Sequence, residues 1–245
     1  MIFGRKARDN SEDAVEIEAV DEDFLDDGPA PDDLDDEVGA PGDTVEEEGE
    51  SAASAASDPR ADGPFDIDEV DLSADDIERV EFGPLIITPF DGLGLQLHGD
   101  PESGAVHALL AAYEDSGLEL ALFAAPRTEG LAAELREETI EEATQAGGHA
   151  GVADGPFGPE VQRVLPMEGP EGEQLFHVSR IWLVEGPRWL LRGTLMGRAG
   201  MVEGENAPAD VFVEFFRNVV VKRDEHPRVP GELIHLAMPS GTAQD

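Results

Sequence analysis

The chain of 245 residues contains no cysteine, which excludes disulfides, thiolate zinc sites, iron–sulfur clusters and cysteine nucleophiles. No stretch approaches the ~18 consecutive apolar residues that a membrane-spanning helix needs. The basic residues near the start, Arg5, Lys6 and Arg8, are not followed by the apolar region of a secretory signal. These absences predict a cytoplasmic protein without membrane insertion.

Basic residues are also scarce. Lysine and arginine together number 16 against 56 aspartates and glutamates, so the formal net charge is −40. Binding of DNA or RNA depends on lysine and arginine contacts to phosphates, so nucleic acid is not an expected partner. The charge would instead attract a basic protein partner. An alternative is that the acidity and the low lysine content reflect a salt-adapted or GC-rich genome.

Aromatic residues are almost missing from the first quarter of the chain. Residues 1–62 hold 22 acidic residues against 4 basic ones, whereas both tryptophans, the single tyrosine and 9 of the 11 phenylalanines follow residue 62. A segment with so few apolar side chains cannot offset its chain entropy, so residues 1–62 are predicted to be a disordered acidic head and linker. Residues 63–240 are predicted to form one domain, and 241–245 a tail. The head is interpreted as a solubility tail or as a docking arm for a basic partner.

Sequence motifs of catalysis and cofactor binding are absent as well. Neither lysine follows a glycine as the Walker phosphate loop requires, and no G-x-S-x-G motif surrounds a serine. The six histidines are scattered without a metal-binding spacing. The acidic head fails the calcium-loop template because Leu25 and Leu34 occupy ligand positions. No catalytic residue, cofactor or metal is therefore expected, and enzymatic activity remains open.

Alternating and continuous apolar runs predict strands through most of the domain. The one long helix is expected over residues 128–146, with Thr128 as its N-cap and Gly147–Gly148 as its end. The hairpin turns 114–117 and 185–187 join the clearest strand pairs. Strands are expected at residues 85–88, 93–97, 105–113, 118–124, 149–153, 160–165, 174–184, 188–196 and 219–221.

Two shorter helices are expected, one within residues 66–79 capped by Ser73 and one capped by Asn206 with Pro208 in its first turn. Because hairpin turns dominate, the fold class is predicted to be α+β. The expected architecture is an antiparallel sheet with one long and one or two short helices packed on one face, a two-layer sandwich.

A set of short segments occurs in order along the domain: Asp62–Asp66 (DGPFD), Val70–Leu72, Ala125–Arg127, Gly155–Gly158 (GPFG), Gly186–Gly193 (GPRWLLRG) and Phe215–Val221 (FFRNVVV). Together they resemble an actinobacterial family, the domain of unknown function 3710. The resemblance covers about residues 62–239 and implies no activity and no site residues, because none is assigned to the family.

The arginines of the domain are the candidate binding residues. Most should neutralise nearby acids, but Arg188, Arg192 and Arg198 cluster around Trp189, and Arg127 precedes the long helix. If Arg127 lies near Arg192 across the sheet, the arginines and the helix N-terminus would form an anion site. A carboxylate of the same protein could equally fill it. Both tryptophans, Trp182 among them, are predicted to be core residues.

The sequence thus favours a noncatalytic protein-interaction or adaptor domain that carries an acidic arm and binds a protein partner, for which the charge favours a basic one. The alternative is a small anionic-ligand-binding protein, or a weak enzyme, that uses Arg127, Arg188, Arg192 and Arg198.

Overall fold

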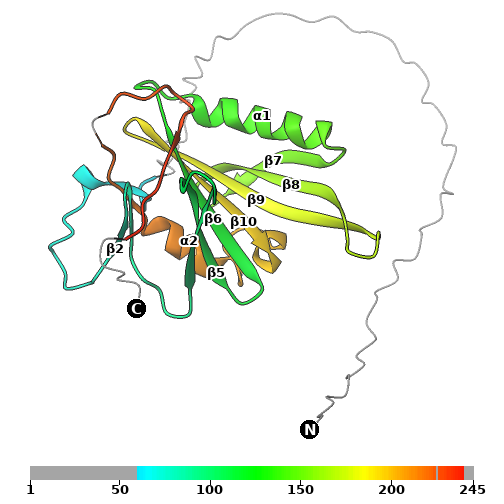
Figure 1. Ribbon diagram of the computed structural model, residues 1–245, viewed down its shortest axis with the longest axis horizontal. Coiled ribbons are helices and arrows are strands. Elements are labelled where there is room, and N and C mark those ends of the chain that lie inside the picture. The colour runs from blue at the N-terminus through cyan, green and yellow to red at the C-terminus, as the bar shows by residue number, and fades with distance from the viewer. Residues whose placement is uncertain (1–59, 225, 240–245) are drawn as a thin grey trace, which may run out of the picture. The chain divides into compact units, whose positions relative to one another are not determined.

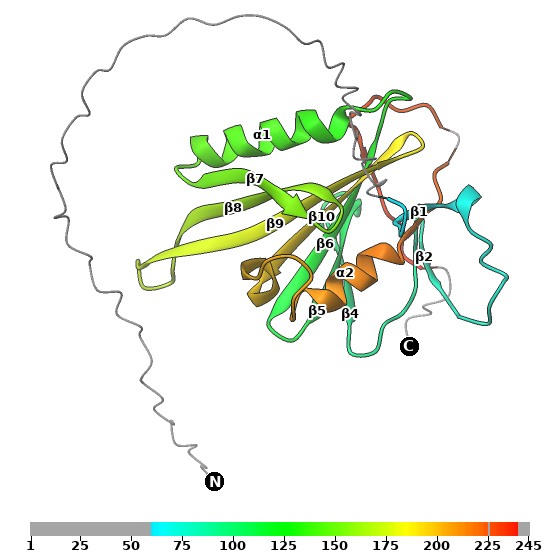
Figure 2. The ribbon, with the colours of Figure 1, turned by 180° about the vertical axis from the view of Figure 1, so that it is seen from behind.

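The computed structural model describes residues 60–224 and 226–239 (Figures 1 and 2). These residues belong to one compact unit of the chain. The predicted disorder of the acidic head concerns residues that lie, except for the last three, outside the described ones.

An antiparallel sheet of eight strands dominates the structure and confirms the predicted α+β class. Its strand order is β4-β5-β6-β10-β9-β8-β7, and β12 pairs with the end of β6. The bounds are β4 Gly94–Gly99, β5 Val106–Tyr113, β6 Ser116–Ala124, β7 His149–Gly155, β8 Gly158–Glu168, β9 Gln174–Gly186, β10 Trp189–Gly197 and β12 Leu233–Ile234. Each neighbouring pair in this order is antiparallel, and all of them except β6 with β10 are consecutive strands joined directly.

A smaller sheet joins the two ends of the domain sequence. Its order is β1-β11-β3-β2, and β1 runs parallel to β11. The turn before β1 needs glycine, because Gly63 has φ of 94° and a Cβ there would lie 2.0 Å from the carbonyl oxygen of Arg217. The bounds are β1 Phe65–Asp66, β2 Val80–Phe82, β3 Leu85–Ile87 and β11 Val220–Val221.

The two α-helices lie on opposite faces of the large sheet. α1 (Leu131–Gln145) packs on Ile181, Leu183 and Leu190. α2 (Asp210–Arg217) packs on the alternate residues of the same strands, such as Trp182 and Leu191. Side chains alternate between the faces of a strand, so the two helices cover different faces. The prediction that all helices pack on one face of a two-layer sandwich is therefore wrong.

The larger core lies between the sheet and α2, and the small sheet closes it. Trp182 and Trp189 are fully buried there, as predicted. Phe212, Phe215 and Phe216 of α2 fill the same core. Burial of each such aromatic side chain stabilises the fold by roughly 1.5–3 kcal/mol.

Local contacts replace two of the predicted helix caps. Residues 66–79 contain only the 3₁₀ helix η1 (Ile67–Glu69), which Asp66 caps, while Ser73 bonds to Asp71 in a turn. The cap of α2 is Ala209; the side chain of Asn206 donates instead to the carbonyl oxygen of Glu203. A four-residue 3₁₀ helix, η2 (Arg198–Met201), follows β10.

Candidate arginine-lined cavity

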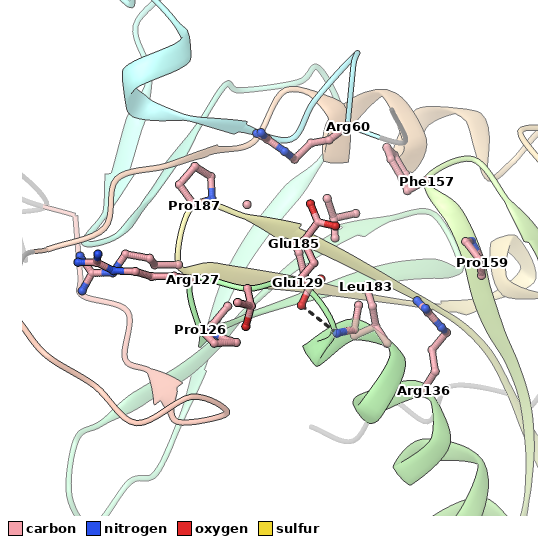
Figure 3. A pocket seen from close by; sticks show the side chains of 16 residues that line it. Arg60, Pro126, Arg127, Glu129, Arg136, Phe157, Pro159, Leu183, Glu185 and Pro187 are labelled. Atoms are coloured by element: carbon pink, nitrogen blue, oxygen red, sulfur yellow. Dashed lines mark hydrogen bonds between the residues drawn. The ribbon is translucent and has the colours of Figure 1, made fainter. Parts of the chain in front are cut away.

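A cavity of about 670 Å³ opens where the β9–β10 turn meets the N-terminus of α1 (Figure 3). A volume of this size falls within the range of small-molecule sites. Its charged lining consists of four arginines and two glutamates; Pro126, Phe157, Leu183 and Pro187 contribute apolar surface. The charged lining residues are Arg60, Arg127, Glu129, Arg136, Glu185 and Arg188.

Glu185 caps α1 from a distant part of the sequence. Its Oε2 accepts the N–H of Gly130 and its Oε1 accepts the N–H of Ala132, both at 3.1 Å (the second is dashed in Figure 3). The carboxylate thereby satisfies two free N–H groups and opposes the positive end of the helix dipole. The predicted Thr128 cap is wrong, since α1 begins at Leu131 after Gly130 and has no side-chain cap of its own. The anion position at this helix N-terminus is thus filled by the same protein, the alternative that the sequence left open.

Arg188 occupies a strained backbone conformation beside the cavity. It is the second residue of the two-residue loop between β9 and β10, and its φ is 65°. For a residue with a side chain, this left-handed region costs roughly 1–2 kcal/mol of conformational energy, whereas for glycine the cost is small. Its backbone oxygen accepts the N–H of Ala125 at 3.0 Å. This bond anchors the loop to the segment that leads into Arg127.

Three of the lining arginines have no protein partner among the described residues. Arg127, Arg136 and Arg188 make no side-chain hydrogen bond or ion pair with any residue of the described ranges. Arg127 and Arg136 lie on opposite sides of Glu129 and Glu185 in Figure 3. Guanidinium groups with free donors are suited to bidentate binding of a carboxylate or phosphate.

A further arginine, Arg223, lies close enough to Arg188 for their charges to interact. Burial, and then the nearby charge of Arg188, lower the pKa of Arg223 below its ordinary value. Like charges held this close repel each other. The nearby Asp224 opposes this effect only in part, and it also bonds to Arg228. Arg127, Arg188 and Arg223, the basic rim, therefore form a local positive region in a strongly acidic protein.

Arg60 is held in place by its neighbours. Its guanidinium forms a bidentate pair with Glu69 and lies 5.7 Å from the ring centroid of Trp189. Trp189 in turn donates to the buried Asp66 at 2.7 Å. These contacts account for part of the DGPFD and GPRW segments, because they place the start of the described domain, the β9–β10 turn and Arg60 at the same wall of the cavity.

The four arginines expected to form one site divide between three places. Arg127 and Arg188 line the cavity. Arg192 faces the α1 side, where its guanidinium lies 5.1 Å from the ring centroid of Phe123. Arg198 begins η2 and lines a separate hollow with Phe176. Sequence reasoning did not identify Arg60, Arg136 or Arg223, since no local pattern connects these positions to the β9–β10 turn.

The cavity offers charge and hydrogen-bond donors. Both oxygens of Glu185 accept N–H groups at the start of α1, while Thr128 and Glu129 add a hydroxyl and a second carboxylate to the lining. Within residues 60–224 and 226–239, no three His, Asp or Glu side chains are grouped so that they could hold a metal ion. The arrangement is suited to holding an anion.

Within the described ranges, no helix has both the length and the apolarity that a membrane span requires. A comparison with curated proteins finds no match. The model of one family, described as "Protein of unknown function (DUF3710)", matches residues 63–245. The match covers most of the chain and confirms the resemblance carried by the short segments, so the chain belongs to this family of unknown function.

Proposed function

We propose that this domain is a noncatalytic binding domain that takes up an anionic ligand in the arginine-lined cavity. The ligand would carry a carboxylate or phosphate group for the basic rim and an apolar part for Pro126, Phe157 and Leu183. Arg127 and Arg188 would hold the anionic group, and Glu185 would keep α1 in position without contacting it.

The conformation of Arg188 is the observation that carries this proposal. A glycine would occupy φ of 65° at lower cost, yet the position holds a long charged side chain without a partner among the described residues. A strained residue at the mouth of a cavity is consistent with a functional constraint. A structural role in neutralising acids is not supported, because no carboxylate within the described ranges pairs with it.

The test replaces Arg188 by glycine in the whole chain. Arg188→Gly removes the guanidinium and relieves the backbone, so we expect the free energy of unfolding to rise by about 1 kcal/mol. The probes are pyrophosphate, citrate and benzoate, and the readout is the ligand-induced shift in Tm. At least one probe should raise the Tm of the unchanged protein, and Arg188→Gly should abolish that shift.

Glu114→Gly is the matched control. Glu114 also has a positive φ, 52°, and lies in the two-residue loop between β5 and β6, away from the cavity. This variant should gain similar stability and keep the full ligand response. The proposal fails if no probe shifts Tm, or if Arg188→Gly responds like Glu114→Gly.

Protein binding is the second candidate function, and a different observation favours it. Large apolar side chains are exposed at the far end of β9 from the cavity. A protein that only held a small ligand would have no need of them. We therefore also propose an interaction role, and the partner it fits is derived below.

A further inference from the structure

The β8–β9 hairpin extends beyond its neighbouring strands. The pairing of β7 with β8 ends at Val164, and the pairing of β10 with β9 ends at Ser179. Residues 165–168 and 174–177 pair only with each other and project from the sheet (Figure 1). We call these two segments and their connecting turn the arm. A two-stranded hairpin of this kind is marginally stable by itself and has free backbone groups along both outer edges.

Exposed apolar side chains concentrate on the arm and beside it. Among the described residues, eight large hydrophobic side chains are exposed, and four of them lie here. Met167 and Leu175 are directly paired on one face and are 49% and 43% exposed. On the other face, Phe176 is 62% exposed and shares a hollow of about 420 Å³ with Met201, which is 64% exposed. Apolar groups gathered in this way mark an interaction surface.

The charges around the arm decide the chemistry of the partner. Glu168, Glu171 and Glu173 lie at its tip, and none forms an ion pair with a described lysine or arginine. Asp115 borders the hollow beside Phe176, and the basic side chains that line it are Arg198 and His177. The local field is therefore negative and would attract cations.

The same charge disfavours two other occupants. A second copy of this chain would bring a net charge of −40 to the surface, and anionic lipid headgroups would likewise be repelled.

We propose that the arm is a docking surface for a basic protein segment that carries apolar side chains. The apolar side chains of the segment would cover Phe176 and Met201, and its lysines or arginines would face Glu168, Glu171 and Glu173. The free outer edge of β9, Gln174–Val178, can pair with an extended backbone, which adds affinity without regard to sequence. This surface lies at the opposite end of β9 from Glu185, so the inference does not depend on the proposed ligand cavity.

Three synthetic peptides test the proposal by fluorescence anisotropy with the whole chain. The first alternates lysine with leucine and phenylalanine, the second replaces its lysines by glutamate, and the third replaces its apolar residues by serine. We expect only the first peptide to bind well, and its affinity to fall as salt is raised. The affinity of the first peptide for the Phe176→Ser variant should be about tenfold lower than for the unchanged protein, the effect expected from losing one buried aromatic contact.

Val229→Ser is the control, because Val229 is equally exposed but belongs to another part of the domain. It should leave peptide binding unchanged. Equal binding of the first and third peptides would show that charge alone acts, and would overturn the proposal. So would equal binding to Phe176→Ser and the unchanged protein, or no binding of the first peptide. Sedimentation of the whole chain over a range of concentrations adds one more outcome: self-association that Phe176→Ser abolishes would make a second copy the occupant instead.

Discussion

The buried Arg180 and the cavity arginines Arg127 and Arg188 differ in whether their N–H groups find acceptors within the protein. Arg180 is 1% exposed, and its guanidinium donates to both oxygens of Glu160 and to the backbone oxygens of Val202 and Gly204, at 2.8–2.9 Å. Arg127 and Arg188 are exposed and donate to no described residue. Burying a guanidinium is costly unless its N–H groups find acceptors, so the bonds of Arg180 end within the protein. The donors of the cavity arginines are left for a ligand.

The carboxylates of Glu160 and Glu185 also differ in what they stabilise. The carboxylate of Glu160 makes several hydrogen bonds within the protein, since it accepts the indole N–H of Trp182 at 2.8 Å in addition to the bonds from Arg180. Through Arg180 it holds the loop after η2 to the sheet. Glu185, in contrast, is half-buried at the cavity wall and stabilises α1 next to solvent. Removal of the Glu160 carboxylate should therefore affect the whole fold, and removal of the Glu185 carboxylate mainly α1 and the cavity.

The largest expected effect comes from breaking the interior pair. Arg180→Ala leaves Glu160 buried without its cation, which should lower the free energy of unfolding by about 3–5 kcal/mol. Urea denaturation followed by tryptophan fluorescence measures it. Arg127→Ala is the matched control and should stay within about 0.5 kcal/mol of the unchanged protein. Similar losses in both variants would remove the distinction between the two kinds of arginine.

An intermediate effect is expected at the helix cap. Glu185→Ala leaves the N–H groups of Gly130 and Ala132 without their acceptor, at a cost of about 1 kcal/mol. The same change removes a negative charge from the cavity, so an anion such as pyrophosphate should bind more tightly. Calorimetric titration beside urea denaturation detects both changes. Weaker anion binding in Glu185→Ala would show that the carboxylate supports the site rather than competing with the ligand.

The smallest effect concerns the pH dependence of the stability that the pair between Arg60 and Glu69 contributes. The hydrogen bond from Arg60 lowers the pKa of Glu69 below its ordinary 4.5, although partial burial opposes this. A carboxyl whose pKa is depressed by folding stabilises the protein above its unfolded pKa. That contribution is lost as the pH falls from about 4.5 through the folded value. In an NMR titration Glu69 should have a midpoint below 4.5, and Arg60→Ala should move it upward; an unchanged midpoint would contradict the pairing.

Much of the architecture could be predicted because the signals are local. Turn chemistry and apolar runs predict the turn at 114–117, the end of the long helix before Gly147–Gly148 and the strand pair of β9 and β10. The second turn, predicted at 185–187, lies at Pro187–Arg188, so Arg188 belongs to the loop and not to the strand predicted to begin with it. The placement of α1 and α2 was predicted wrongly although a signal existed. Ile181–Val184 is apolar at every position, which is typical of a strand buried on both faces rather than one.

The site itself was only partly accessible. Arg127 and Arg188 could be named because Arg127 precedes the predicted long helix and Arg188 begins a predicted strand. Nothing near Thr128 in the sequence indicates that Glu185 would cap the helix in its place. The acceptor of a helix N-terminus is set by proximity in space, and here a carboxylate 55 residues away accepts the N–H of Gly130. Arg192 was assigned to the wrong neighbourhood for the same reason: its strand position sets its face, but not which other arginines share that face.

The sequence by itself determined the family, the antiparallel α+β class, the acidic character and the two tryptophans of the core, because these depend on composition, short motifs and the two-residue period of strands. Only the tertiary structure decided which arginines donate hydrogen bonds to described residues and which do not, and where apolar side chains stay exposed. Those properties depend on which distant segments meet. Arg180 finds its acceptors on β8 and after η2, whereas Arg188 meets none within the described residues, and the difference lies in the packing around two otherwise identical side chains.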